Sequence, residues 1–188
     1  MGRNNLLNWG EDGSQTLGVQ QIYVHPDFQS SDTSSFDADL ALVQLNTLAS
    51  FSSTIRPICL WDQSTEIDDM VNKQAVVAGW GKTERGELST VPNKLSIKVV
   101  SDAECMRSNF QLSAILTNRA FCAGNRDGSS PCNGDSGGPL MINRNGAWYI
   151  RGIVSISLQN EDRTSCDPYN YIFFTNVAKF IPWIRSHL

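Results

Sequence analysis

Short apolar runs separated by turn residues recur along this chain, and they constrain its fold more than any other feature. The run at residues 94–100, KLSIKVV, alternates Leu95, Ile97 and Val99 with polar neighbours, which is the period of a half-buried strand. Similar runs occupy residues 17–24, 39–45, 74–81, 147–158 and 171–177. Because glycine- and aspartate-rich turns separate them, the pattern predicts an all-β fold, a sandwich or a barrel, in a single domain over residues 1–188.

Two segments have the pattern of helices. Residues 101–109 begin with Ser101 and Glu104, which have the spacing of a capping box. The C-terminal segment, residues 176–188, has apolar residues at helical spacing, and we expect Pro182 to lie in or near the first turns of that helix.

Composition excludes several classes of function. The chain has 15 basic and 19 acidic residues, a net charge of −4, and no cluster of positive charge that would suit a nucleic acid. No apolar run approaches the roughly 20 residues of a membrane span. None of the cysteines forms a Cys-x-x-Cys pair, which argues against zinc, and five cysteines indicate an oxidising compartment.

Ser136 lies within Gly134-Asp135-Ser136-Gly137-Gly138, which satisfies the pattern G-x-S-x-G. One interpretation is the nucleophile elbow of an α/β-hydrolase, with Asp162 or Asp167 and His187 as the partners of Ser136. That elbow requires a helix after the serine, whereas two glycines and a proline follow Ser136 here. The next residues, LMI and NRNGAWYI, indicate a hairpin instead.

The longer string CNGDSGGPL (132–140) resembles the active-site signature of the chymotrypsin-like serine proteases. Other segments resemble that family in the same order: DADLALVQL, IRPICLW, VVAGWGKT, AFCAG, GIVSIS and FTNVAKFIPWI. The resemblance covers nearly the whole chain. It implies two antiparallel Greek-key β-barrels with a C-terminal helix, and a serine endopeptidase that needs no metal or cofactor and acts on protein or peptide substrates.

The resemblance also implies the roles of individual residues. Ser136 corresponds to the nucleophile, and Asp39 to the acid that orients the catalytic histidine. The backbone N–H groups of Gly134 and Ser136 correspond to the oxyanion hole. Asp135 corresponds to the acid that pairs with the new N-terminal amine after zymogen cleavage.

The histidine of this triad has no counterpart. Residues 1–38 contain no Ala-His-Cys-like stretch and no activation sequence. His25 lies in a segment that resembles a strand end, and His187 lies at the end of the C-terminal helix. We therefore expect the chain alone to be close to inactive, with the catalytic histidine, the activation site and part of the first barrel on an upstream segment. The alternative is a non-catalytic homologue that acts by binding in a proteolytic cascade.

The resemblance implies two disulfides, Cys105–Cys122 and Cys132–Cys166. It leaves Cys59, whose counterparts in modular or clip-type cascade proteases bond to an upstream pro- or light chain. A secreted zymogen is therefore expected.

The specificity pocket is also implied by the resemblance. Its base corresponds to Ser130, which has no charge, so cleavage after lysine or arginine is disfavoured. Its walls correspond to Ser155, Ser157 and Ile172. A branched residue at position 172 is expected to fill the pocket and to favour small or medium apolar groups, unless its side chain turns into the core.

Overall fold

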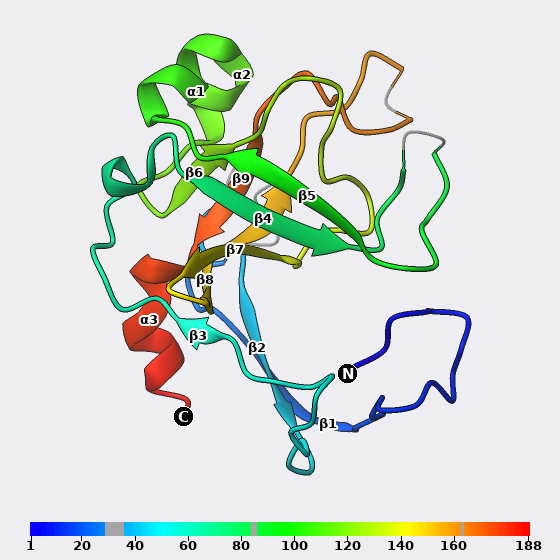
Figure 1. The fold of residues 1–188 in the computed structure, drawn as a ribbon. Coiled ribbons are helices and arrows are strands. Elements are labelled where there is room, and N and C mark those ends of the chain that lie inside the picture. The colour runs from blue at the N-terminus through cyan, green and yellow to red at the C-terminus, as the bar shows by residue number, and fades with distance from the viewer. Residues whose placement is uncertain (29–35, 84–85, 163) are drawn as a thin grey trace.

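The computed structural model describes residues 1–28, 36–83, 86–162 and 164–188. Most of the regular structure is a curled antiparallel sheet, with a separate two-stranded ribbon below it and a helix at the C-terminal end (Figure 1). The prediction of an all-β fold with a C-terminal helix is confirmed.

The large sheet follows the strand order β5-β4-β7-β8-β9-β6. Its strands are β4 (Gln74–Gly79), β5 (Asn93–Lys98), β6 (Ala120–Ala123), β7 (Pro139–Arg144), β8 (Ala147–Ile156) and β9 (Ile172–Asn176). A bridge between Val99 and Ala123 joins the two ends of this order, and Val100 N donates to Cys122 O at 3.1 Å. The sheet therefore closes into a barrel, which leaves no free edge along that seam.

The hairpin predicted after Ser136 is present as β7 and β8. Arg144 pairs with Ala147, so Asn145 and Gly146 form a two-residue turn. Their φ angles are +52° and +85°, as a type I′ turn requires, and Asn-Gly is the pair that adopts this turn most readily.

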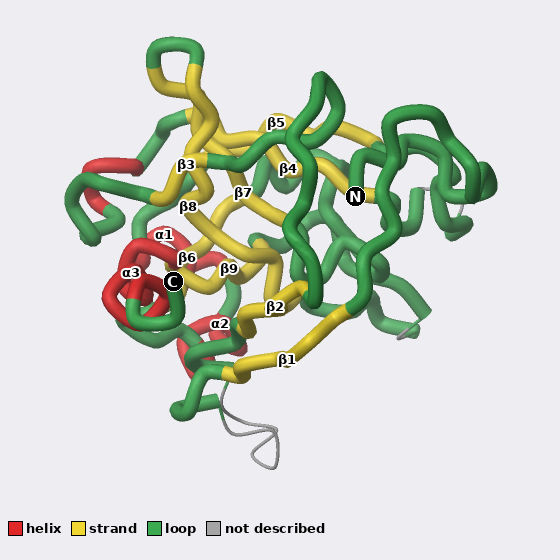
Figure 2. The backbone as a smooth tube through the Cα atoms, turned by 90° about the horizontal axis from the view of Figure 1, so that it is seen from below, coloured by secondary structure: helices red, strands yellow, loops and turns green. Residues whose placement is uncertain are grey.

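The ribbon consists of β1 (Val19–Val24) and β2 (Ala41–Leu45), and it lies beside the barrel (Figure 2). Ile22 pairs directly with Val43, and both side chains are more than half exposed, as is that of Val24. The opposite face carries Leu42, which packs against a buried cluster. The ribbon is thus apolar on both faces but covered on only one. A short third strand, β3 (Cys59–Leu60), pairs in parallel with β8.

Three helices and a short 3-10 turn, Asp68–Met70, complete the described parts of the chain. Helix α1 (Asp102–Ser108) is capped by Ser101, whose hydroxyl accepts from Glu104 N at 3.2 Å, as the sequence predicted. Helix α2 (Phe110–Ile115) follows directly and was not predicted. The predicted C-terminal helix, α3, spans Val177–Arg185, with Pro182 in its second turn.

Helix α3 positions the segment that precedes β2. Its apolar face packs on Ala38 and Leu40, and all of these side chains are buried. The buried residues of α3 are Val177, Ala178, Phe180, Ile181 and Ile184. The amphipathic spacing seen in the sequence therefore serves to fix the backbone on either side of Asp39. In the described residues, no helix is both long and apolar enough to cross a membrane.

Arg151 in β8 is fully buried, and its partners are all uncharged. Its guanidinium donates to Asn176 Oδ1 and to Thr65 O, and it lies over the rings of Trp61 and Phe121. Burial lowers the pKa of Arg151 to about 10, and the charge of Glu66 opposes that shift. The side chain therefore fills a core position and satisfies buried acceptors.

We expect Arg151→Ala to lower the free energy of unfolding by about 4 kcal/mol, because it opens a cavity and leaves Asn176 Oδ1 without a donor. Arg151→Met is the matched control, since it keeps most of the volume and removes the buried charge, and it should cost less than half as much. Urea unfolding of the three proteins measures the difference. Equal losses for alanine and methionine would contradict the packing role.

Candidate active site

The loop that carries Ser136 is a tight turn tied to β8. Gly137 N donates to Val154 O at 2.8 Å, and Val154 N donates to Gly138 O at 2.9 Å. Gly134 and Gly137 have φ angles of +101° and +79°, in the region that favours glycine. Ser136 is exposed at the tip of this turn, and its hydroxyl has no hydrogen-bond partner in the part of the chain that the structure describes.

Asp39 contacts Ser155, the residue that follows Val154 in β8. Its Oδ2 accepts from Ser155 Oγ at 2.6 Å, and its main-chain oxygen accepts from Thr175 Oγ1 at 2.9 Å. Since Val154 holds the Ser136 loop and Ser155 holds Asp39, two adjacent residues of β8 bring the predicted nucleophile and acid to one site. These residues are almost 100 positions apart in the sequence.

Ser155 was predicted to line the specificity pocket, but its hydroxyl is directed to Asp39. The pairing of β8 with β9 shifts register between Val154 and Ile156, which makes Ser155 the extra residue of a bulge. A bulge re-aims the side chain of the extra residue, and this explains the difference. The sequence did not predict Ser155 and Thr175 as partners of Asp39, because no local sequence pattern at either residue indicates the bulge.

The backbone N–H groups of Gly134 and Ser136 have no acceptor among the described residues. They are therefore free to donate to another molecule. A Cβ on residue 134 would lie 2.9 Å from Leu88 Cδ2 and 3.0 Å from Gly81 Cα. The close approach of this neighbouring segment, together with the positive φ, makes glycine necessary at this position.

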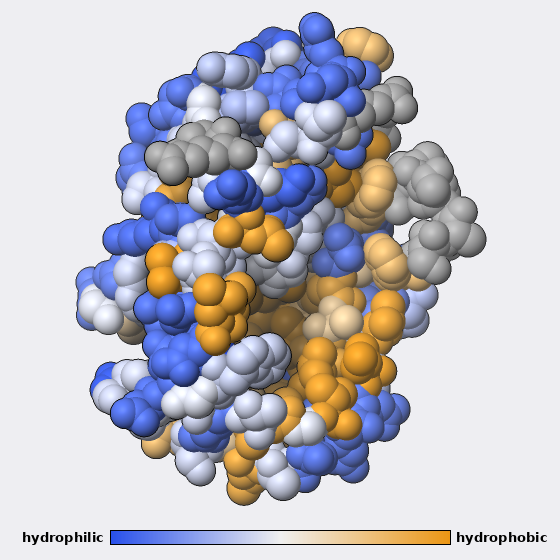
Figure 3. All heavy atoms as spheres, turned by 90° about the vertical axis from the view of Figure 1, so that its right-hand side faces the viewer, coloured by the Kyte–Doolittle hydropathy of each residue, from blue (hydrophilic) through white to orange (hydrophobic). Residues whose placement is uncertain are grey.

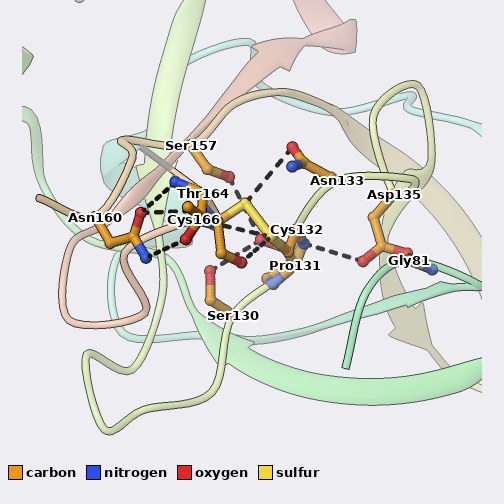
Figure 4. Close-up of a disulfide and its surroundings, with 11 residues drawn as sticks. Gly81, Ser130, Pro131, Cys132, Asn133, Asp135, Ser157, Asn160, Thr164 and Cys166 are labelled. Carbon is orange, nitrogen blue, oxygen red and sulfur yellow. Dashed lines mark hydrogen bonds between the residues drawn. A yellow bond between two sulfur atoms is a disulfide. The ribbon is translucent and has the colours of Figure 1, made fainter. Parts of the chain in front are cut away.

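Asp135 points away from Ser136 toward β4. Its Oδ1 accepts from Gly81 N at 2.8 Å and its Oδ2 from Cys132 N at 3.1 Å (Figure 4). A Cβ on Gly79 or Gly81 would lie 2.1 Å from a carboxylate oxygen, so both glycines leave room for this acid. The amine of Met1 donates to Gln15 O instead, at 2.7 Å.

A cavity of about 870 Å³ opens between the end of β4 and the loop before Ser136. Its walls include Gly79, Gly81, Ser130, Asp135 and Cys166. The predicted pocket base, Ser130, and the predicted ion-pair acid, Asp135, thus border one cavity.

Among the residues predicted to form the specificity pocket, the side chains of Ser130 and Ser157 lie in a different place from that of Ile172. Ser130 Oγ donates to Pro131 O at 2.9 Å, and Ser157 Oγ donates to the same oxygen at 3.4 Å, so these two hydroxyls share one acceptor (Figure 4). Ile172 is 1% exposed and packs in the main core with Ala123 and Phe174. Its side chain does not border the cavity, so it gives no reason for a narrowed pocket.

Two disulfides hold the surroundings of the site. Cys132–Cys166 joins the Ser136 loop to the segment before β9, and Cys105–Cys122 joins α1 to β6. Both pairings are those that the sequence resemblance implied. Cys59 in β3 is exposed and forms no disulfide with another cysteine of the chain.

Both histidines are engaged away from Asp39. His25 lies at the end of β1, is 8% exposed and contacts the rings of Phe180 and Trp183 in α3. Its Nδ1 accepts from Asp27 N at 3.2 Å. The ring of His187 contacts that of Tyr23 edge-on and that of Trp183 at a tilt.

The pKa of His25 lies below its usual value near 6.5, chiefly because of burial and further because of the charge of Arg119, while Asp27 and Asp37 oppose the shift. The unfolded chain thus binds more protons than the folded one as the pH falls below about 6.5. We expect the stability contributed by neutral His25 to be complete above that pH and lost as the pH falls through the lower folded-state pKa.

Urea unfolding between pH 5 and 8 measures this loss. His25→Gln, which keeps an acceptor but does not titrate, should flatten the pH dependence in this window. If the slope were unchanged in that variant, His25 would not be its source.

Comparison with known proteins agrees with this geometry. The family described as Trypsin matches residues 1–184. The chain is 37% identical over 217 aligned residues to "Serine protease gd" of Drosophila melanogaster, covering 99% of this chain and 41% of that protein. It is 33% identical to "CLIP domain-containing serine protease B4" of Anopheles gambiae, covering 94% of this chain and 48% of that protein.

The chain thus spans less than half the length of these curated relatives. Among solved structures, neuropsin, a serine protease expressed in the limbic system of mouse brain, matches with a TM-score of 0.82 at 24% identity, over 100% of this chain and 77% of that one. That likeness concerns the fold alone. The family match and the two relatives show that the chain belongs to the trypsin family of chymotrypsin-like serine proteases.

Proposed function

We propose that residues 1–188 are part of a serine endopeptidase domain whose catalytic histidine is supplied by an upstream segment of a secreted zymogen. The observation that carries this proposal is the placement of the Ser136 loop and Asp39 on adjacent residues of β8. A serine hydroxyl reacts only when a base takes its proton. His25 and His187 are engaged elsewhere, so the base has to come from outside these residues.

The chemistry then follows from the residues in place. The incoming imidazole accepts the proton of Ser136, and Asp39, held by Ser155, orients that imidazole and stabilises its charged form. Ser136 Oγ attacks the peptide carbonyl, and the free N–H groups of Gly134 and Ser136 stabilise the resulting oxyanion. The imidazolium gives its proton to the departing amine as the acyl-enzyme forms, and a water that loses a proton to the same imidazole then hydrolyses the acyl-enzyme.

The ribbon supports an upstream segment. The exposed face of β1 and β2 carries Ile22, Val24 and Val43, and Figure 3 shows apolar side chains around a hollow on one side of the molecule. A two-stranded ribbon is marginally stable by itself, and a sheet with apolar residues on both faces needs cover on both. Further strands of an incomplete first barrel would provide that cover.

Two more features fit a zymogen. Asp135 borders an open cavity, so a new N-terminal amine can reach its carboxylate after activation cleavage. Cys59 is exposed and available to an upstream pro- or light-chain segment.

The test compares residues 1–188 with the same protein carrying the sequence encoded upstream and an engineered activation site. Peptide hydrolysis and labelling by a fluorophosphonate should appear only in the activated longer protein. If the upstream sequence has no histidine in an Ala-His-Cys-like stretch, or the activated protein neither hydrolyses peptides nor reacts with the label, the endopeptidase proposal fails. The chain would then be a non-catalytic homologue that binds protein partners.

The proposed cleavage specificity rests on Ser130, the residue that corresponds to the base of the specificity pocket. Because this side chain is uncharged, the activated protein should not prefer lysine or arginine before the scissile bond. Ser130→Asp should raise kcat/KM for arginine substrates about tenfold or more, the worth of a hydrogen bond to a charged group. Profiling with a peptide library measures the preference of the unaltered protein and that of Ser130→Asp. Efficient cleavage after arginine by the unaltered protein would refute Ser130 as the base of the pocket.

A further inference from the structure

The chain contains two Asn-Gly pairs, Asn133-Gly134 and Asn145-Gly146. In such a pair the backbone nitrogen of glycine can attack the side-chain carbonyl carbon of asparagine, because glycine has no Cβ to obstruct the approach. The two pairs share the same local sequence chemistry but differ in what the structure does with the attacking nitrogen.

At the first pair that nitrogen is free. Gly134 N donates to no acceptor in the described parts of the chain, and Asn133 is exposed in a turn. The side chain of Asn133 makes one weak contact, 3.9 Å from its Oδ1 to Cys166 Sγ (Figure 4). The main-chain oxygen of Asn133 accepts from Lys82 N at 2.9 Å, but neither the attacking nitrogen nor the side-chain amide has a normal hydrogen bond in the described residues.

At the second pair the nitrogen is held. Gly146 N donates to Asn143 Oδ1 at 3.2 Å. Asn145 and Gly146 are the two central residues of the β7–β8 turn, and the pairing of Arg144 with Ala147 fixes both backbone angles. Forming a five-membered ring there would break the hydrogen bond and distort the turn.

We propose that Asn133 is a site of spontaneous deamidation in the folded protein. Gly134 N bonds to Cγ of Asn133 and gives up its proton, while the side-chain nitrogen leaves with it as ammonia, which closes a succinimide. Water then adds to either imide carbonyl and cleaves the C–N bond there. The product is aspartate, or isoaspartate with the backbone running through the former side chain.

The consequence for catalysis rests on the proposed function. Isoaspartate adds one methylene to the main chain immediately before Gly134, and both products add a negative charge there. The N–H of Gly134, a donor of the proposed oxyanion hole, would be displaced. The added negative charge would also repel the oxyanion that this N–H stabilises. Ageing of the protein would therefore switch the site off without a protease or an inhibitor.

The first experiment tests the modification and needs no activity. The folded 188-residue protein is incubated at neutral pH in ¹⁸O-labelled water, digested and mapped by mass spectrometry. Label should enter residue 133 about fivefold or more faster than residue 145, the protection that one hydrogen bond gives. In urea with the disulfides reduced, the two rates should become equal. Equal rates in the folded protein, or a faster reaction at Asn145, would overturn the proposal.

The second experiment tests the consequence in the activated longer protein. Asn133→Gln should slow the decay of activity during storage, and the matched variant Asn145→Gln should not. The isoaspartate form, separated by ion exchange, should lose about 100-fold in kcat, as on removal of one oxyanion-hole donor. If activity never appears, the function proposal fails while the labelling result stands. If activity decays equally in both variants, the switch is refuted.

Discussion

The activated domain carrying Ser136→Ala should lose about 10⁶-fold in kcat, the loss seen when the serine of a Ser-His-Asp site is removed. The physical reason is that no other hydroxyl stands at the tip of the glycine-rich turn that β8 holds through Val154. Labelling by a fluorophosphonate should disappear as well. Hydrolysis of a chromogenic peptide, followed to single turnovers, is the measurement.

Ser113→Ala is the matched control, because Ser113 is exposed on α2 and donates only to Phe110 O. It should leave kcat unchanged. The structure around residue 136 should also survive in Ser136→Ala, since the hydroxyl makes no hydrogen bond within the described residues. A Ser136→Ala protein that kept a measurable share of its activity would exclude the acyl-enzyme mechanism.

The second large effect concerns Asp39. Asp39→Asn should lower kcat about 10⁴-fold, the loss seen in the Ser-His-Asp template, because an amide orients the imidazole in the wrong tautomer. Ser155→Ala removes one hydrogen bond to the carboxylate and should cost only about tenfold. The pH profile of kcat/KM separates the two, since loss of the Asp39 charge lowers the pKa of the incoming histidine.

Ser155→Ala is thus the graded comparison for Asp39→Asn. Equal losses in the two variants would mean that Asp39 acts only as a structural partner of β8. An Asp39→Asn protein within tenfold of the original would remove Asp39 from the proposed triad.

The strands were largely predictable because their signal is local. Alternation of Leu95, Ile97 and Val99 placed β5, and the capping box at Ser101 placed the start of α1. Helix α2 and strands β3 and β6 were missed. Each is short, and tertiary contacts rather than its own sequence pattern hold it in place.

The sequence by itself determined the family and the two disulfides, and it predicted the roles of Ser136 and Asp39, because long ordered motifs carry them. Only the tertiary structure decided which side chain meets which. The bulge at Ser155 turned that hydroxyl to Asp39, and core packing enclosed Ile172. It also separated two Asn-Gly pairs, because the glycine nitrogen is hydrogen-bonded in one and has no acceptor among the described residues in the other. Register, packing and hydrogen bonding depend on residues far apart in the chain, and no local pattern reports them.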